Sequence, residues 1–266
     1  MRIATWNILH GQLLNSNNLN DAAAVFSECV AELDADLLVL QEVDQRYPRS
    51  ANLNQTQIAA SAMKTPYWAF APVFYIYGEG ADDQREPSTG ADIITESNPT
   101  DRGGYGISII SKIPVLKWER LELSRAKFGK FMNISEGRKS KRFYAKDHQR
   151  IALAAHLETV IAINVHLSFI WPFNYFQFLQ VKRWARNLEK ETGKSVFILG
   201  DFNLASWVNG RQWKSLFTEL TFPIWKPDRQ IDYILTRGDF EIRNGAVTAF
   251  DISDHLAVQI EFTPRT

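Results

Sequence analysis

Two polar side chains, Asp201 and Asn203, directly follow a short apolar run in the segment KSVFILGDFNLAS (194–206). The run Val-Phe-Ile-Leu at 196–199 is typical of a buried strand. Gly, Asp and Asn all favour tight reversals, so the pair is explained either by a turn or by a reactive site. Because residues two apart in an extended segment project to the same side, both side chains can address one centre.

Other apolar runs also end beside side chains that carry oxygen or nitrogen atoms. The oxygen donors of this set are Asn7, Glu42, Asp201, Asn203, Asp232 and Asp254, and two imidazoles are added by His166 and His255. Hard divalent cations such as Mg²⁺ or Mn²⁺ take oxygen ligands, and imidazoles exchange protons near neutral pH. The sequence holds no cysteine cluster for zinc, no P-loop and no dinucleotide fingerprint. This set favours metal-assisted hydrolysis, most naturally at phosphorus.

Each of these residues also has a structural explanation when it is taken alone. An asparagine can end a strand by turning it, and a histidine can be a hydrogen-bonded core residue. Several polar strand ends within one domain nevertheless indicate convergence on one polar rim. We expect Asp254 and His255, as chain neighbours, to diverge, so that one holds a metal while the other meets the substrate. Asp232 could accept a hydrogen bond from His255 and fix its tautomer.

The composition is that of a globular protein of 266 residues, 45% hydrophobic and with zero net charge. No linker or low-complexity tract divides the chain, so we predict a single domain over 1–266. Cys29 is the only cysteine, which excludes an internal disulfide and fits a reducing compartment. The start MRIATWNILHG lacks the apolar core of a signal peptide, and 161–173 is too short and polar to cross a bilayer. We therefore expect a soluble, cytoplasmic and monomeric protein without a transmembrane segment.

The hydrophobic pattern predicts more strands than helices. Strands are predicted at 2–8, 37–43, 67–73, 105–111, 150–157, 159–166, 196–199, 231–236, 241–249 and 256–262. Helices are predicted after a cap at Asn18 or Asn20, and over 54–64, about 174–191 and near 209–219. Several strands are adjacent in sequence, which favours antiparallel sheets with helices on their outer faces.

Three further segments stand outside this pattern. Residues 77–104 are rich in Gly, Asp, Pro and Ser, and we expect a long loop there. Residues 119–150 contain ten Lys/Arg against four Asp/Glu and form either a solvated excursion or a patch that attracts phosphates. The aromatic segment SFIWPFNYFQF (168–178) is either core packing for the next helix or an exposed loop that meets a base, a lipid or another apolar group.

Seven motifs together resemble one superfamily. They are ATWNIL, LLVLQEV, YGISIISKIP, INVHLS, ILGDFNLAS, RQIDYIL and SDHLAVQIEF, in the order and approximate spacing of the endonuclease/exonuclease/phosphatase superfamily of DNase-I-like metal hydrolases. The resemblance extends from residue 2 to about residue 262. It implies an α+β fold, namely a four-layer α/β/β/α sandwich in which two mainly antiparallel sheets are flanked by helices, with the site at one rim.

The resemblance also implies a metal site. Asn7 and Glu42 resemble the asparagine and glutamate of that site, and Asp254 resembles a further metal ligand. Many DNA-repair nucleases of the superfamily carry a carboxylate two residues after the first-motif asparagine, where this chain has Leu9. This difference argues against an abasic-site endonuclease and leaves the other branches open.

The catalytic roles implied by the resemblance fall on five residues. Asp201 resembles the aspartate that orients or activates the attacking water, or protonates the leaving group, and Asn203 resembles the asparagine that positions phosphate and nucleophile. His255 resembles the histidine that contacts the scissile phosphate, with Asp232 orienting it. His166 resembles a phosphate-binding histidine.

The sequence thus predicts an enzyme, a Mg²⁺- or Mn²⁺-dependent phosphoesterase that hydrolyses phosphodiester or phosphomonoester bonds. It would act as a nuclease or as a small-molecule or lipid phosphoesterase. The alternative is a catalytically silent phosphate- or nucleic-acid-binding module that retains the fold, against which the presence of Glu42, Asp201 and His255 together argues. The substrate class stays open among nucleic acids, inositol phosphates and phospholipid headgroups, because a fold does not choose among them.

Overall fold

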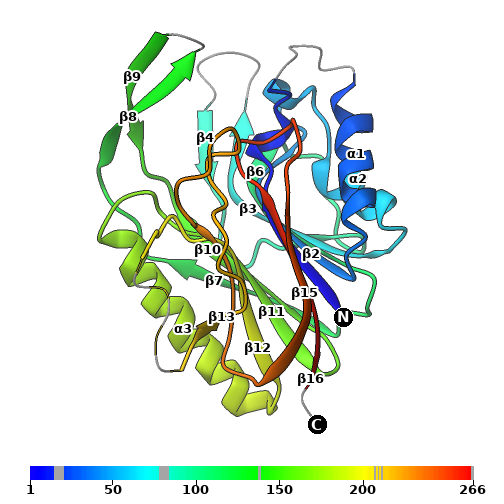
Figure 1. Ribbon diagram of the computed structural model, residues 1–266. Helices are drawn as coiled ribbons and strands as arrows, with labels where there is room; N and C mark the ends of the chain where they lie inside the picture. The colour runs from blue at the N-terminus through cyan, green and yellow to red at the C-terminus, as the bar shows by residue number, and fades with distance from the viewer. Residues whose placement is uncertain are drawn as a thin grey trace.

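Two β-sheets pack face to face, and helices cover their outer faces (Figure 1). The computed structural model describes residues 1–14, 21–77, 84–136, 139–206, 208, 210 and 212–264. One side is covered by α1 (Ala22–Leu33) and α2 (Gln55–Ala62), and the other by α3 (Phe173–Thr192). The four-layer sandwich predicted from the sequence is confirmed. None of the helices in the described ranges has the length and hydropathy that a membrane span requires.

The first sheet carries both chain ends. Its strands are β1 (Arg2–Asn7), β2 (Leu37–Gln45), β3 (Tyr67–Tyr77), β4 (Gln84–Pro87), β5 (Ile94–Thr95), β6 (Gly104–Ser111), β15 (Phe240–Thr248) and β16 (Ala257–Pro264). They run in the order β15-β16-β1-β2-β6-β3-β4, with β5 also paired to β3. Only the β1–β2 pair is parallel among the described pairs of this sheet, and α1 forms its crossover.

The second sheet repeats this arrangement around α3. Its strands are β7 (Lys117–Leu123), β10 (Arg150–His156), β11 (Val160–His166), β12 (Ser195–Asp201), β13 (Lys214–Ser215) and β14 (Asp232–Thr236). They run in the order β13-β14-β12-β11-β10-β7, and the parallel β11–β12 pair is connected through α3. A separate hairpin of β8 (Gly129–Glu136) and β9 (Lys139–Lys146) projects from one end of the molecule (Figure 1).

Alternation along the strands divides the apolar residues into three layers. Ile3 of β1 and Leu199 of β12 belong to the core between the sheets. Trp6 belongs to the layer under α1 and α2, and Ile198 to the layer under α3. With a period of two, Asn7 faces the inter-sheet space like Ile3, and Asp201 faces it like Leu199. The polar ends of these strands therefore meet between the two sheets.

The carboxyl ends of the two parallel pairs lie at this edge. Asn7 is the register partner of Gln41 at the end of the β1–β2 pair, and His166 is the register partner of Asp201 at the end of the β11–β12 pair. Parallel strands end at the same edge of a sheet, so each crossover unit delivers two polar residues to one place. This is the polar rim that the sequence predicted.

The helix predicted near 209–219 is wrong. Part of this segment forms β13, which pairs with β14, and the described residues around it are not helical. Trp213 and Phe217 have the spacing of one helix face, but they pack into different layers, Trp213 under α3 and Phe217 between the sheets. Residues four apart point to the same side in a helix and in a regular strand alike, so the irregular chain around the two-residue β13 is what lets these side chains enter different layers.

Two predicted loops also contain strands. Within 77–104, β4 and β5 pair with β3, and within 119–150 the structure contains β7 and the β8–β9 hairpin. The polar composition of both segments fits this outcome, because each of these strands pairs with a single neighbour among the described strands and leaves its other edge unpaired. The predicted helix caps Asn18 and Asn20 lie outside the described residues; α1 follows Asp21, whose side chain makes no capping hydrogen bond.

Candidate active site

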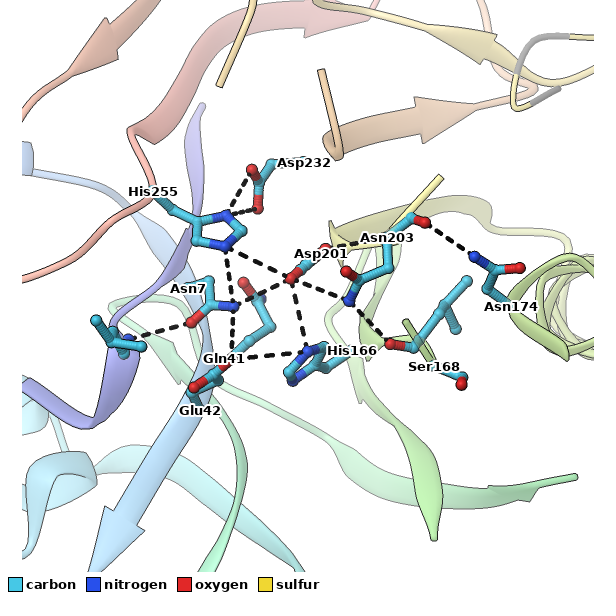
Figure 2. Close-up of polar contacts among 12 residues, drawn as sticks. Asn7, Gln41, Glu42, His166, Ser168, Asn174, Asp201, Asn203, Asp232 and His255 are labelled. Atoms are coloured by element: carbon cyan, nitrogen blue, oxygen red, sulfur yellow. Dashed lines mark hydrogen bonds and ion pairs between the residues drawn. The ribbon is translucent and has the colours of Figure 1, made fainter. Parts of the chain in front are cut away.

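The predicted site residues come together at the rim between the sheets, and Figure 2 labels all of them except Asp254. The first sheet supplies Asn7 and Glu42, and the second supplies His166, Asp201 and Asp232. Asn203 follows β12, and Asp254 and His255 precede β16. Each of the eight residues has a side-chain contact of 3.9 Å or less with at least one other residue of the set. Residues more than two hundred positions apart therefore form one constellation.

Glu42 reaches the site through a bulge in β2. The register with β6 shifts between Leu40 and Val43, and Glu42 adopts a left-handed φ of 56°. Regular alternation would direct Gln41 between the sheets and Glu42 away from them. A bulge inserts one residue and re-aims the side chain at that point. Strain of this kind is concentrated at functional sites, and here it brings a carboxylate beside Asn7.

The Asn7 amide is the hub of the cluster. Its Nδ2 lies 3.2 Å from Glu42 Oε1, 3.0 Å from Asp201 Oδ2 and 3.5 Å from His255 Nε2 (Figure 2). Its Oδ1 accepts a hydrogen bond from the backbone N–H of Leu9 at 3.1 Å, which fixes the orientation of the amide. One neutral side chain thus separates two carboxylates that would otherwise repel each other.

His255 is oriented by Asp232, as the sequence predicted. Its Nδ1 lies 3.0 Å and 3.2 Å from the two carboxylate oxygens of Asp232, which is fully buried. The backbone N–H of His255 donates to Ser253 Oγ, and that hydroxyl donates to the carbonyl of Asn7. Burial disfavours the charged imidazole, but the carboxylate of Asp232 outweighs it and raises the pKa of His255 to about 10. The ring is therefore a cation at neutral pH, with Nε2 directed to the cluster.

A tight turn after β12 holds Asp201 and Asn203 together. The backbone N–H of Asn203 donates to Asp201 Oδ1 at 2.8 Å, and Asn203 has a left-handed φ of 49°. The Asn203 amide donates to the carbonyl of Leu167 at 3.1 Å. Gly200 has φ 139°, and a Cβ there would lie 1.9 Å from the carbonyl oxygen of Val165, so only glycine fits. The pair is both a turn and part of the site.

His166 faces Asp201 from the neighbouring strand. Its Nε2 lies 3.5 Å from Asp201 Oδ2 and 3.9 Å from Glu42 Oε1. Burial, with the charge of Arg150, lowers the pKa of His166 to about 3. Burial raises the pKa of Asp201 to about 7, against the effect of the His255 cation. The site thus places a neutral imidazole and a cationic imidazole on either side of one carboxyl group.

Asp254 also reaches the cluster, so the expectation that it diverges from His255 is wrong. Its Oδ1 lies 3.9 Å from His255 Nε2, because both residues lie in a bend before β16 rather than in an extended strand. This Oδ1 is buried, and none of the described residues forms a hydrogen bond with it. Burial raises the pKa of Asp254. A buried carboxylate oxygen without a partner is unfavourable unless a cation or a proton satisfies it.

The donor set fits a hard divalent cation. Asp201, Asp232 and His255 offer ligand atoms within 4.8 Å of one another, but both oxygens of Asp232 already face His255 Nδ1. Asp254 Oδ1 has no hydrogen-bond partner among the described residues, and Glu42 accepts one hydrogen bond of 3.2 Å, from Asn7 to Oε1, while its Oε2 lies 3.9 Å from His10 Nδ1. Burial opposes ionisation of Glu42, but the neighbouring His10 and His166 imidazoles and the Asn7 amide lower its pKa below the ordinary value. An ionised carboxylate, an unpartnered carboxylate oxygen and nearby amides are ligands that Mg²⁺ and Mn²⁺ accept.

The polar layer beneath the site was not predicted. Gln41 Nε2 donates to Asn164 Oδ1 at 2.8 Å across the two sheets, and it also contacts Thr5 Oγ1 at 3.1 Å. Asn164 and Thr5 lie two residues before His166 and Asn7 in their strands, so the period of two was the available signal. These residues hold the two sheets in register directly below the reacting groups.

A buried arginine beside the site was also missed. Arg150, counted in the sequence as part of a basic excursion, is 3% exposed at the start of β10 and pairs at 3.3 Å with Asp147, whose side chain is buried. Asp147 also accepts a hydrogen bond at 2.8 Å from the Oγ of Ser168, which lies two residues after His166 in the chain.

The aromatic segment 168–178 is partly buried and partly exposed: Phe178 is fully buried, whereas Trp171 is 73% exposed. Part of the segment is therefore core packing and part is exposed, and contact of the exposed part with a base, a lipid or another apolar group stays a prediction.

This fold, with its polar cluster at one rim, is the DNase-I-like sandwich. The sequence profile of the Endonuclease/Exonuclease/phosphatase family matches residues 4–255. The chain belongs to that family. Enzymes of the family typically use divalent metals and act on phosphoesters. Among curated proteins, none matches the chain by sequence.

Several solved structures share this fold. An endonuclease/exonuclease/phosphatase from Beutenbergia cavernae is 17% identical with a TM-score of 0.62, over 98% of this chain and 71% of that one. A mannosyl-6-phosphatase from Bacteroides thetaiotaomicron is 14% identical with a TM-score of 0.62, over 99% of both chains. The human nocturnin catalytic domain with a bound sulfate is 13% identical with a TM-score of 0.60, over 99% of this chain and 94% of that one. At these identities the likeness shows the fold alone.

Proposed function

We propose that this protein is a phosphoesterase that requires Mg²⁺ or Mn²⁺. The observation that supports it best is the buried, unpartnered Asp254 Oδ1 beside a cluster in which Asp232 is neutralised by His255 while Glu42 keeps a lowered pKa. A bound cation would balance the excess negative charge at this rim. The neighbouring histidines and amides can donate hydrogen bonds to the oxygens of a phosphate.

Glu42 and Asp254 would hold the cation, with Asn7 beside them. When bound, a divalent cation supplies charge neutralisation for the phosphoryl oxygens and for the leaving oxygen. Asn7 keeps Glu42 and Asp201 at fixed positions through its amide. Preorganised groups of this kind lower a barrier because they need no rearrangement when charge develops.

The remaining residues act on the phosphate and on the attacking water. His255, as a cation with Nε2 directed inward, donates a hydrogen bond to a phosphoryl oxygen, and Asp232 keeps it charged. His166 and the Asn203 amide donate from the opposite side. Asp201 lies between these donors and orients the water, whose proton it accepts as the water attacks phosphorus in line.

The test is hydrolysis of bis(p-nitrophenyl) phosphate and p-nitrophenyl phosphate by the purified chain. We expect turnover with Mg²⁺ or Mn²⁺, none with EDTA, and losses of at least about 10²-fold in Asp201→Ala and His255→Ala. Glu158→Ala is the matched control, because Glu158 is an exposed carboxylate in the β10–β11 turn at the other end of the sheet. Full activity in Asp201→Ala and His255→Ala would contradict the assigned roles.

The alternative is a silent phosphate-binding module. It would bind phosphate without turnover of any substrate and without an effect of metal. The proposed activity can take the form of a monoesterase, the activity that the name of the mannosyl-6-phosphatase neighbour states for that protein, or of a diesterase. A panel of single-stranded and duplex DNA, RNA, inositol phosphates and sphingomyelin separates these forms.

A further inference from the structure

A cavity of about 370 Å³ lies beside the candidate metal site, between η1 (Leu9–Gly11) and the first turns of α1 and α2. Its polar wall includes His10, Arg49 and Gln55, and its apolar wall includes Leu13, Ala22 and Phe26. Pockets that take small ligands have volumes of roughly 300–1,000 Å³ and combine an apolar lining with a few placed polar groups. This cavity has both properties.

His10 connects the cavity to the metal site. It lines the cavity, and its Nδ1 lies 3.9 Å from Glu42 Oε2. Apart from this longer contact with Glu42, the buried Nδ1 has no hydrogen-bond partner among the described residues. A buried polar atom without a partner, at the boundary between a cavity and a candidate metal ligand, indicates a group that a ligand completes.

The backbone around His10 is strained and held in place. Leu9 and His10 have φ values of 44° and 47°, a conformation that side-chain-bearing residues adopt rarely. The carbonyl of His10 accepts a hydrogen bond from Gln55 Nε2 at 2.6 Å. Gly11 has φ 69°, and a Cβ there would lie 2.8 Å from Gln55 Nε2. Such strain is concentrated at ligand sites, where the surrounding structure maintains it.

Arg49 is fixed on the same wall. Its Nε and Nη2 donate to the two oxygens of Asp44 at 2.8 Å and 2.7 Å, and its guanidinium lies 4.4 Å from the centre of the Tyr47 ring. Gln55 Oε1 accepts from the backbone N–H of Asp44 at 2.7 Å, so one glutamine ties Asp44 to the His10 turn. The Arg49 side chain is 35% exposed, so it keeps access to a ligand. The polar wall is therefore preorganised.

We propose that this cavity binds the organic group of a small phosphoester, a monosaccharide- or polyol-sized group rich in hydroxyls. The inference rests on the proposed function, because the phosphate would lie at Asp201 and His255. Hydroxyls match the polar wall of His10 and Arg49, and the C–H faces of a sugar match Leu13 and Phe26. A nucleic-acid polymer or a membrane-embedded lipid needs an open surface rather than a cavity of this size.

The test compares two substitutions in one helix. Ala22→Phe fills the cavity, whereas Ala24→Phe introduces the same ring at an exposed position two residues further along α1. The substrates are mannose 6-phosphate, glucose 6-phosphate and glycerol 3-phosphate, with p-nitrophenyl phosphate as the reference. We expect Ala22→Phe to lower the ratio of kcat/KM for the sugar or polyol phosphates over the reference at least tenfold, and Ala24→Phe to change it less than twofold.

His10→Asn tests the polar wall of the cavity. Asn tolerates the left-handed backbone at this position, and we expect the substitution to raise KM for the sugar or polyol phosphates more than it lowers kcat.

Binding is measured separately from turnover. In Asp201→Asn protein with Mg²⁺, we expect these phosphates to raise Tm, and Ala22→Phe in the same background to abolish that rise. Absence of turnover on every substrate with this Tm pattern intact would overturn the proposed function but keep the cavity assignment. Turnover of the reference with equal effects of Ala22→Phe and Ala24→Phe would overturn the cavity assignment alone. Preferred hydrolysis of oligothymidylate or of sphingomyelin vesicles, unaffected by Ala22→Phe, would do the same and identify the other substrate class.

Discussion

Asn7 at the end of β1 and Asp201 at the end of β12 are joined across the two sheets by a 3.0 Å hydrogen bond from Nδ2 to Oδ2. Asn7 ends the first strand of the parallel crossover unit β1–α1–β2, and Asp201 ends the last strand of the unit β11–α3–β12. The same Nδ2 lies 3.2 Å from Glu42. One amide therefore ties the proposed metal ligand of the first sheet to the proposed water-orienting carboxylate of the second.

Substitution of Asn7 by alanine tests this connection. Asn7→Ala removes the donor shared by Asp201 and Glu42 and frees both carboxylates to move apart. We expect kcat for bis(p-nitrophenyl) phosphate to fall about 10²-fold, the loss that a displaced catalytic group produces. Circular dichroism and Tm should show that the fold is retained. A wild-type kcat in Asn7→Ala would mean that the two carboxylates keep their positions without the amide.

The charge of His255 depends on Asp232 and is directly measurable. In the metal-free protein the pKa of His255 is raised to about 10, so its ring carries both protons at pH 7.5. Asp232→Asn keeps the shape but removes the negative charge that raises this pKa, and we expect the ring to be neutral at that pH. Nitrogen chemical shifts of the imidazole report the difference, and kcat should fall at least about 10²-fold in parallel. Identical shifts in the two proteins would exclude this role of Asp232.

Cation binding should stabilise the fold through Glu42 and Asp254. A ligand that binds only the native state at 100 times its Kd contributes about 2.7 kcal/mol. We expect Mg²⁺ or Mn²⁺ to raise Tm in the wild-type chain, and Glu42→Gln or Asp254→Asn to reduce the rise. Glu158→Gln should keep it in full. An equal rise in all four proteins would place the cation elsewhere.

Much of the fold and of the site was predictable because the relevant residues obey simple periods. Asn7, His166 and Asp201 end apolar strands, and the alternation along each strand directs their side chains between the sheets. Because these side chains are polar, they also indicate which edge of the sheets carries the site. Asp232 beside His255 was predicted from residue types alone and is confirmed.

Other features were not predictable because the local pattern was ambiguous. The spacing of Trp213 and Phe217 fits one face of a helix, and only the tertiary structure shows that these side chains enter different apolar layers. In a regular strand the side chain of Glu42 would point away from the space between the sheets. The bulge in β2 turns it toward the site, and such a bulge has no unique sequence signature. Gln55 acts at His10 and Asp44 through contacts that depend on tertiary placement.

Cys29 provides a test of the packing under α1. Burial raises the pKa of its thiol to about 11, so only about 0.1% is thiolate at pH 8. We expect 5,5′-dithiobis(2-nitrobenzoate) to modify the native protein at least about tenfold more slowly than the chain unfolded in guanidinium chloride. Because Cys29 is the only cysteine, the absorbance change reports this site alone. Equal rates would mean that the layer between α1 and the sheet opens readily.

Asn164 of the second sheet supports the bulge that carries Glu42 in the first. Its Nδ2 donates to the carbonyls of Leu40 and Ser108 at 2.9 Å and 2.8 Å, and these residues form the last regular pair before the β2–β6 register shift. Asn164→Leu leaves both carbonyls buried without this donor, and each such group costs about 1–3 kcal/mol.

We therefore expect Asn164→Leu to lower the free energy of unfolding by about 3 kcal/mol in urea titrations and to weaken the Tm rise with Mg²⁺, because Glu42 loses its support. Asn244→Leu, at an exposed position of β15, should stay within about 0.5 kcal/mol of wild type. If Asn164→Leu lowers stability but leaves the Mg²⁺ response unchanged, the bulge maintains Glu42 without help from the second sheet.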